Sequence, residues 1–127
     1  MEYDVVIKAE KTIRALSGEH NEKRMITKSQ IRKFLCAVNN LKNKVDIYCL
    51  HNPEAKLLNE ELTQAVKFLK VNIIYAAKDR LVKDFMEKAE LADIIDDIGN
   101  NVEAYNKFCK YVEALVAYHK FHGGKDS

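Results

Sequence analysis

Three acidic side chains near residue 95 are the first candidates for chemistry in this sequence. Asp93 and Asp97 lie four residues apart, so a helix would place them on one face, and Asp96 lies beside them. Paired carboxylates can bind a divalent cation or act as general acid and base. Because no histidine, lysine or second carboxylate motif accompanies them at a recognisable spacing, we interpret them as a solvated helix face. A metal-dependent hydrolase that uses Asp93 and Asp97 remains a third hypothesis.

Two histidines near the end of the chain are a second candidate for metal chemistry. His119 and His122 lie one helical turn apart, but a zinc site on a helix needs a third ligand, and the sequence offers none in a known pattern. His119 continues an apolar stripe, which favours a packed histidine. Ser17 and Ser29 lack a nucleophile motif, and no glycine-rich phosphate loop occurs. The sequence therefore predicts no catalytic residue, no metal site and no cofactor.

The cysteines and the amino-terminal residues bear on where the protein works. Cys36, Cys49 and Cys109 are odd in number, far apart and without a C-x-x-C spacing, which argues against a disulfide framework and a zinc site. Free cysteines of this kind fit a reducing cytoplasm. The apolar run at the amino terminus is too short for a signal peptide, and no stretch approaches the roughly 20 apolar residues that span a bilayer. We therefore predict a cytoplasmic protein with no membrane partner.

Basic residues are informative through their positions, because the net charge is only +2. At about 100° per residue, lysines and arginines gather on one flank of each of two predicted helices, beside the apolar stripe. The two rows are Lys28, Arg32 and Lys42 in one helix and Lys67, Lys70 and Lys78 in the next. Such rows suit contacts with phosphates, which position a nucleic acid without reading its sequence. The alternative is an ordinary solvated surface.

The length and composition predict one helical domain. The chain has 127 residues, of which 47% are hydrophobic and 31% charged, with four glycines and one proline. This mixture is typical of an amphipathic helical protein, and no segment alternates apolar and polar residues as a strand would. The spacing predicts helices over 4–16, 28–51, 59–78, 81–98 and 102–121. We therefore predict an all-α fold, a compact bundle of about five helices.

Local signals set the ends of these helices. Thr27 and Gln30 form a capping box at the start of the second helix, and Pro53 ends that helix. Ser17-Gly18 is expected to stop the first. The third helix has the widest apolar arc, which predicts a central position. Four aromatic residues, two on this helix and two on other helices, exceed what one small core buries, and they predict a surface that binds a partner. They are Tyr48, Phe68, Tyr75 and Tyr118.

Several segments resemble a known family. They are Ser29-Gln30-Ile31-Arg32-Lys33, Phe68-Leu69-Lys70-Val71 leading to Tyr75, Val82-Lys83-Asp84-Phe85, and Tyr111-Val112-Glu113 through Gly123-Gly124-Lys125. Over residues 27–125 the chain resembles the small subunit of the type III-A CRISPR effector, the Csm complex. The resemblance implies a family core over these residues and a variable amino-terminal helix and loop over 1–26, within a single domain over 1–127.

The resemblance also implies a function. Such subunits stack in several copies along the guide–target RNA duplex, contact the backbone of the target RNA, and bind one another and the other effector subunits, while cleavage belongs to companion subunits. A non-catalytic, RNA-binding structural subunit is therefore expected. The expected RNA contacts are Lys28, Arg32, Lys33, Lys67, Lys70, Lys78, Arg80, Lys120 and Lys125. The alternative is a helical protein–protein adaptor with no nucleic-acid role.

Overall fold

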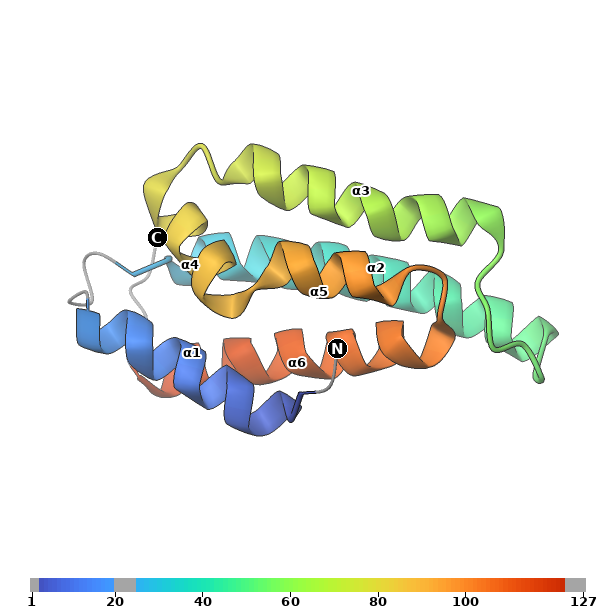
Figure 1. Cartoon of the computed structure of the whole chain (residues 1–127), viewed down its shortest axis with the longest axis horizontal. Helices are drawn as coiled ribbons and strands as arrows, with labels where there is room; N and C mark the ends of the chain where they lie inside the picture. Colours follow the sequence, from blue (N-terminus) through green and yellow to red (C-terminus); the bar gives the residue numbers. More distant parts are fainter. Residues whose placement is uncertain (1–2, 20–24, 123–127) are drawn as a thin grey trace.

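The computed structural model describes residues 3–19 and 25–122, and within these ranges it contains six helices and no strand. The helices are α1 (Val5–Glu19), α2 (Lys28–His51), α3 (Glu60–Ala76), α4 (Arg80–Ala89), α5 (Leu91–Ile98) and α6 (Val102–Phe121). They form one elongated bundle, along which α2 runs from end to end (Figure 1). The all-α prediction is confirmed. The predicted helix over 81–98 is two helices, so the bundle has six helices where about five are expected.

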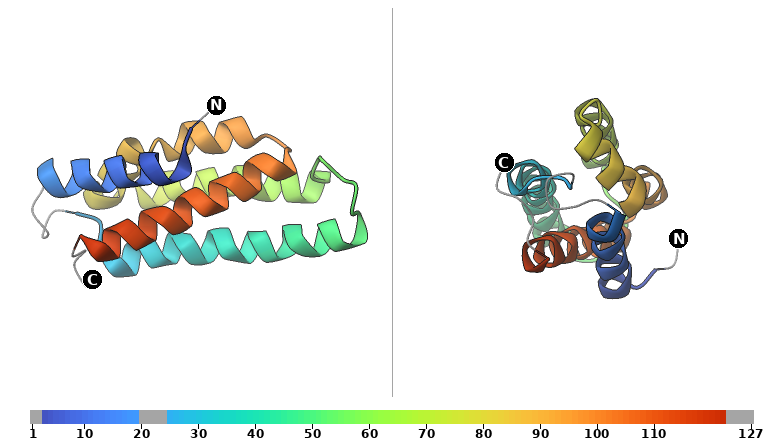
Figure 2. Two further views of the ribbon diagram at one scale, coloured as in Figure 1. Left: turned by 90° about the horizontal axis from the view of Figure 1, so that it is seen from below. Right: turned by 90° about the vertical axis from the view of Figure 1, so that its left-hand side faces the viewer.

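The last helix, α6, lies at the centre of the packing. It contacts α1, α2 and α5, and it runs beside α2 in the opposite direction (Figure 2). Tyr105, Phe108, Tyr111, Val112 and Leu115 are all fully buried along it. The prediction that the third helix is central is wrong, because α3 buries only one stripe against its neighbours and exposes the rest of its wide apolar arc.

Helix starts follow the local signals closely. Gln30 N donates to Thr27 Oγ1 at 3.1 Å and Thr27 N donates to Gln30 Oε1 at 3.0 Å, so the capping box is confirmed. Asn59 and Asn101 cap α3 and α6 in the same way, each with its side-chain oxygen accepting a backbone N–H. Helix α2 ends at His51, directly before Asn52-Pro53, so the prediction that Pro53 ends this helix is also confirmed.

The first helix extends further than Ser17-Gly18 predicts. It continues to Glu19, and Ser17 Oγ donates to the Arg14 carbonyl at 3.2 Å. A hydroxyl that bonds back to the preceding turn is compatible with a continuing helix. Ala9, Ile13 and Leu16 of α1 are buried against the bundle, so α1 is an integral part of the core.

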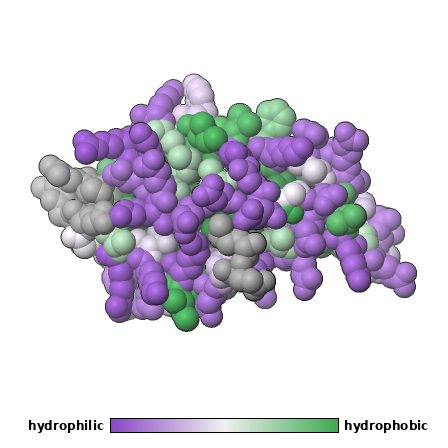
Figure 3. All heavy atoms as spheres, in the orientation of Figure 1, coloured by the Kyte–Doolittle hydropathy of each residue, from purple (hydrophilic) through white to green (hydrophobic). Residues whose placement is uncertain are grey.

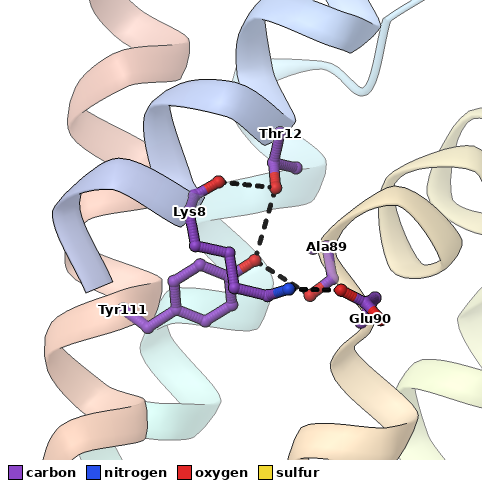
Figure 4. A network of polar contacts seen from close by, with 5 residues as sticks. All are labelled: Lys8, Thr12, Ala89, Glu90 and Tyr111. Carbon is purple, nitrogen blue, oxygen red and sulfur yellow. Dashed lines mark hydrogen bonds and ion pairs between the residues drawn. The ribbon is translucent and has the colours of Figure 1, made fainter. Parts of the chain in front are cut away.

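Glu90 separates α4 from α5. It has φ 56°, a left-handed conformation that is costly for a residue with a Cβ. Tertiary contacts surround it: Lys8 Nζ forms an ion pair with its carboxylate, and the Tyr111 hydroxyl donates to the Ala89 carbonyl at 2.9 Å (Figure 4). Thr12 Oγ1 lies 3.4 Å from the same hydroxyl. The break thus lies where side chains of α1 and α6 reach the end of α4.

Candidate nucleic-acid interface

One end of the bundle combines basic residues from α2 and α6. The buried ring of His119, 1% exposed, donates from Nε2 to the Ile26 carbonyl at 2.6 Å, which ties the last turn of α6 to the residue that precedes the cap of α2. Lys28 and Arg32 lie one turn apart at the start of α2, and Lys120 follows His119. We call Lys28, Arg32 and Lys120 the α2–α6 ridge. Two segments far apart in sequence therefore bring three predicted contacts to one end.

The ridge and the far end of the same flank of α2 differ in their ion pairs. Arg32 and Lys120 are exposed, and neither has an ion-pair partner among the residues that the structure describes. Lys42, farther along the same flank of α2, differs: its Nζ lies 3.0 Å from Asp46 Oδ1 one turn later. An ammonium held by a carboxylate has less net charge to offer a phosphate. The two ends of this flank are therefore electrostatically distinct.

Two further predicted contacts lie near a groove between α2 and the α3–α4 turn. The groove has a volume of about 390 Å³ and an apolar floor that includes Phe34 and Ile73. Lys33 lines it, as does Asp79, which caps α4 next to Arg80. Lys33 and Arg80 are exposed. The structure thus places them on the α3 side of α2, away from the flank that carries Arg32.

The three predicted contacts on α3 and just after it have different surroundings. Lys70 Nζ lies 2.8 Å from Asp96 Oδ1 of α5, an ion pair between residues 26 positions apart. Lys78 Nζ lies over the Tyr75 ring, 4.3 Å from its centroid. Lys67 is exposed and has no ion-pair partner in the described ranges. The row expected on this helix is therefore not a uniform basic strip.

The outer side of α3 carries a feature that the sequence indicates only in part. Phe68, Val71, Ile74 and Tyr75 are 59%, 53%, 50% and 68% exposed, and we call these four residues the α3 apolar face. Of the four aromatic residues expected to exceed the core, Phe68 and Tyr75 are exposed, whereas Tyr48 and Tyr118 are partly buried against it. Val71 and Ile74 widen the same apolar arc in the sequence, and the structure leaves them exposed as well.

The metal hypotheses gain no support from the described residues. Among them, no group of three or more His, Cys, Asp or Glu side chains is placed to hold a metal ion. Asp96 is engaged by Lys70, and His119 is packed, with burial lowering the pKa of its imidazole below the usual 6.5. Lys125 lies outside the described residues.

Buried titratable groups elsewhere serve packing. Burial raises the pKa of the Cys109 thiol to about 11, so it remains protonated at neutral pH. Burial likewise raises the pKa of Tyr105 and of Tyr111 well above the usual range. Their hydroxyls therefore stay protonated, and Tyr105 donates to the Val38 carbonyl at 2.7 Å. These groups join helices and offer no nucleophile.

Comparison with known proteins identifies the family. A family model described as "Csm2 Type III-A" matches residues 4–125, nearly the whole chain. The chain belongs to the Csm2 type III-A family. A "CRISPR system Cms protein Csm2" of Streptococcus thermophilus is 38% identical over 95% of this chain and 93% of its own length. Csm2 proteins of Enterococcus italicus and Mycobacterium tuberculosis are 31% and 30% identical over 76% and 97% of this chain.

Membership in the Csm2 family confirms the resemblance to the small subunit of the type III-A CRISPR effector. The match begins at residue 4 and so includes α1, beyond the span over 27–125 on which the resemblance rests. In the described ranges, no helix is long and apolar enough to cross a membrane.

Proposed function

We propose that this Csm2 protein is a non-catalytic structural subunit of a type III-A RNA-guided interference complex. It stacks in several copies along the guide–target duplex and contacts the backbone of the target RNA without reading its sequence. Its partners are this RNA duplex, the other subunits of the effector and further copies of itself. Family membership over residues 4–125 supports the place in the complex.

The α2–α6 ridge supports the RNA contact. Arg32 is the central residue of the proposal, because it is exposed, unpaired in the described ranges and one turn from Lys28, near the end of the bundle where His119 joins α6 to the start of α2. A guanidinium can bind a phosphate through two parallel N–H donors. Contacts of this kind fix the register of an RNA without base specificity.

The remaining predicted contacts are graded by their surroundings. Lys33, Arg80 and Lys67 are exposed and extend the proposed contact surface, whereas Lys70 and Lys78 are engaged by Asp96 and Tyr75. Lys42 is engaged by Asp46 and is left out of the surface. We therefore expect the largest electrostatic contribution from the ridge.

The test is an RNA-binding titration of the assembled effector over a salt series. Replacing Arg32 with alanine weakens binding to unrelated target sequences by similar factors, and the slope of log K against log salt falls by about 1 for each copy in the complex. Lys42→Ala is the matched control, because it removes a paired lysine from the same flank of the same helix. A loss confined to one RNA sequence contradicts the backbone contact.

The alternative, a helical adaptor whose lysines are merely solvated, makes the opposite prediction. In that case a variant without Arg32 and Lys120 assembles with its companion subunits, and the complex binds RNA with unchanged affinity and salt slope. The same titration therefore separates the two functions.

A further inference from the structure

The α3 apolar face forms a contiguous patch on the outside of the bundle. Its four side chains recur at helical spacing on the side of α3 opposite the buried stripe of Leu62, Val66, Leu69 and Ile73. In the space-filling view, hydrophobic atoms gather along the edge of the molecule that α3 forms (Figure 3). Half or more of each side chain is exposed, so the patch amounts to about 400 Å² of apolar surface. The largest apolar patch on a monomer is commonly of about this size, and such a patch is often functional.

Charges of opposite sign lie beyond the two ends of this face. Glu60 and Glu61 are exposed in the first turn of α3, whereas Lys78 and Arg80 are exposed just after its last turn. Asp79, between these two cations, is engaged as the N-cap of α4 and accepts from the Leu81 and Val82 amides. The helix thus has an acidic start and an apolar face that Lys67 adjoins, and two cations follow its end.

This order makes α3 complementary to itself in an antiparallel arrangement. We propose that the α3 apolar face binds the same face of a second copy of this chain, about a two-fold axis close to Val71. Phe68 of each copy then packs against Tyr75 of the other, and the acidic start of each α3 faces the basic end of its counterpart. A two-fold contact of this kind requires a patch that is complementary to itself, as this one is.

The dimensions of α3 allow the apolar packing and the pairing of opposite charges to occur in the same dimer. At about 1.5 Å per residue, Glu61 lies roughly 16 Å from the proposed axis, and Ala76, the last residue of α3, lies roughly 7 Å from it on the opposite side. Lys78, whose ammonium lies against the Tyr75 ring, and the exposed Arg80 follow in the turn after α3, toward the acidic start of the other copy. With about 400 Å² of apolar surface per copy, the contact belongs to the small, weak class of interfaces, so we expect dissociation in the micromolar range.

This two-fold contact rests on the self-association in the proposed function and names the surface through which two free copies bind. A two-fold contact closes at two copies, so it holds free chains as a pair and does not extend into a row. Stacking along an RNA duplex then needs a different contact between copies. Because Lys67 and Lys78 adjoin the paired face, α3 has less room for RNA in the dimer than the α2–α6 ridge has.

The first experiment is sedimentation equilibrium of the full chain over a concentration series. Val71→Ser removes apolar surface from both sides of the proposed axis, so the dissociation constant rises about tenfold. Val6→Ser is the matched control, because Val6 is 52% exposed on α1 while Val71 is 53% exposed on α3. Circular dichroism establishes that each variant remains folded. Equal dissociation constants for the two variants overturn the proposal.

Charge exchange tests the antiparallel orientation. One variant carries Glu60→Lys and Glu61→Lys, and a second carries Lys78→Glu and Arg80→Glu. Each alone juxtaposes like charges and dimerises more weakly than the wild type at low salt, whereas an equimolar mixture restores the attraction at both ends. Dimerisation of the mixture at wild-type strength supports the proposal, and absence of this rescue overturns it.

Binding of RNA at the same face is the competing outcome. If Val71→Ser leaves self-association unchanged but weakens RNA binding by the assembled effector, the face is an RNA platform and the proposal falls. Failure of the proposed function has a different signature, since Arg32→Ala then leaves RNA binding intact whatever the dimerisation constant. The two results are independent, because Arg32 lies on α2 outside the paired face.

Discussion

Removal of a single hydroxyl from the core tests how the α4–α5 break is held. Tyr111 is fully buried, and its hydroxyl donates to the carbonyl of Ala89, the last residue of α4. The last four carbonyls of a helix have no partner within that helix, so an external donor is needed where the end is buried. Tyr111→Phe deletes this donor and leaves the shape of the ring unchanged.

The expected cost follows from what remains after the change. Ala89 is fully buried, so its carbonyl loses a donor at a position that water reaches poorly. A buried acceptor that loses its partner costs about 1–3 kcal/mol. We therefore expect Tyr111→Phe to lower the free energy of unfolding by about 2 kcal/mol and the melting temperature by several degrees.

Urea unfolding followed by circular dichroism measures this difference. Tyr118→Phe is the control, because Tyr118 lies on the same helix, is half-buried and has a hydroxyl that makes no hydrogen bond with a described residue. It should change the free energy of unfolding by less than about 0.5 kcal/mol. Equal effects of the two substitutions would show that the Tyr111 hydroxyl does not stabilise the junction.

Three further predictions concern stability and reactivity. Burial lowers the pKa of His119 below 6.5, so as the pH falls the unfolded chain binds this proton before the folded chain does. The free energy of unfolding therefore falls as the pH drops below about 6.5. Urea unfolding at pH 7.5 and 5.5 measures this change, and the His119→Gln variant should lack this part of the pH dependence. Glu90→Gly is made in a Lys8→Ala background, which already lacks the ion pair between these residues. Glycine relieves the left-handed strain at position 90, so the free energy of unfolding in urea rises by about 1 kcal/mol. A decrease in the free energy of unfolding contradicts this prediction. A thiol reagent modifies exposed Cys36 rapidly in the native protein at pH 7.5, whereas buried Cys109 reacts only on unfolding, as mass spectrometry of the labelled peptides would show.

Local signals explain why most helix boundaries follow from the sequence. The capping box at Thr27 and the proline after Asn52 act through neighbouring residues, so the sequence contains the whole cause. The break at Glu90 is different, because Ala89-Glu90 contains no glycine, proline or turn motif. Its contacts come from Lys8 and Tyr111, which are distant in the sequence.

The same limit applies to the candidate site. Periodicity places Lys67 and Lys70 on one flank of α3, but only the fold shows that Asp96 engages Lys70 and leaves Lys67 exposed. Hydrophobicity places Val71 in a wide apolar arc without telling a core from a surface for a partner. Charge positions are therefore predictable from sequence, whereas charge neutralisation and exposure depend on elements that meet only in the folded chain.

The hydrogen bond between His119 and Ile26 has a consequence for biosynthesis. It joins residues 93 positions apart, so the α2–α6 ridge cannot form until almost the whole chain has left the ribosome. A nascent chain that has emerged as far as α5 already carries Arg32 but lacks the helix that completes its surroundings. In the proposed function, the complete ridge is therefore available to RNA only once the last helix has packed against the start of α2.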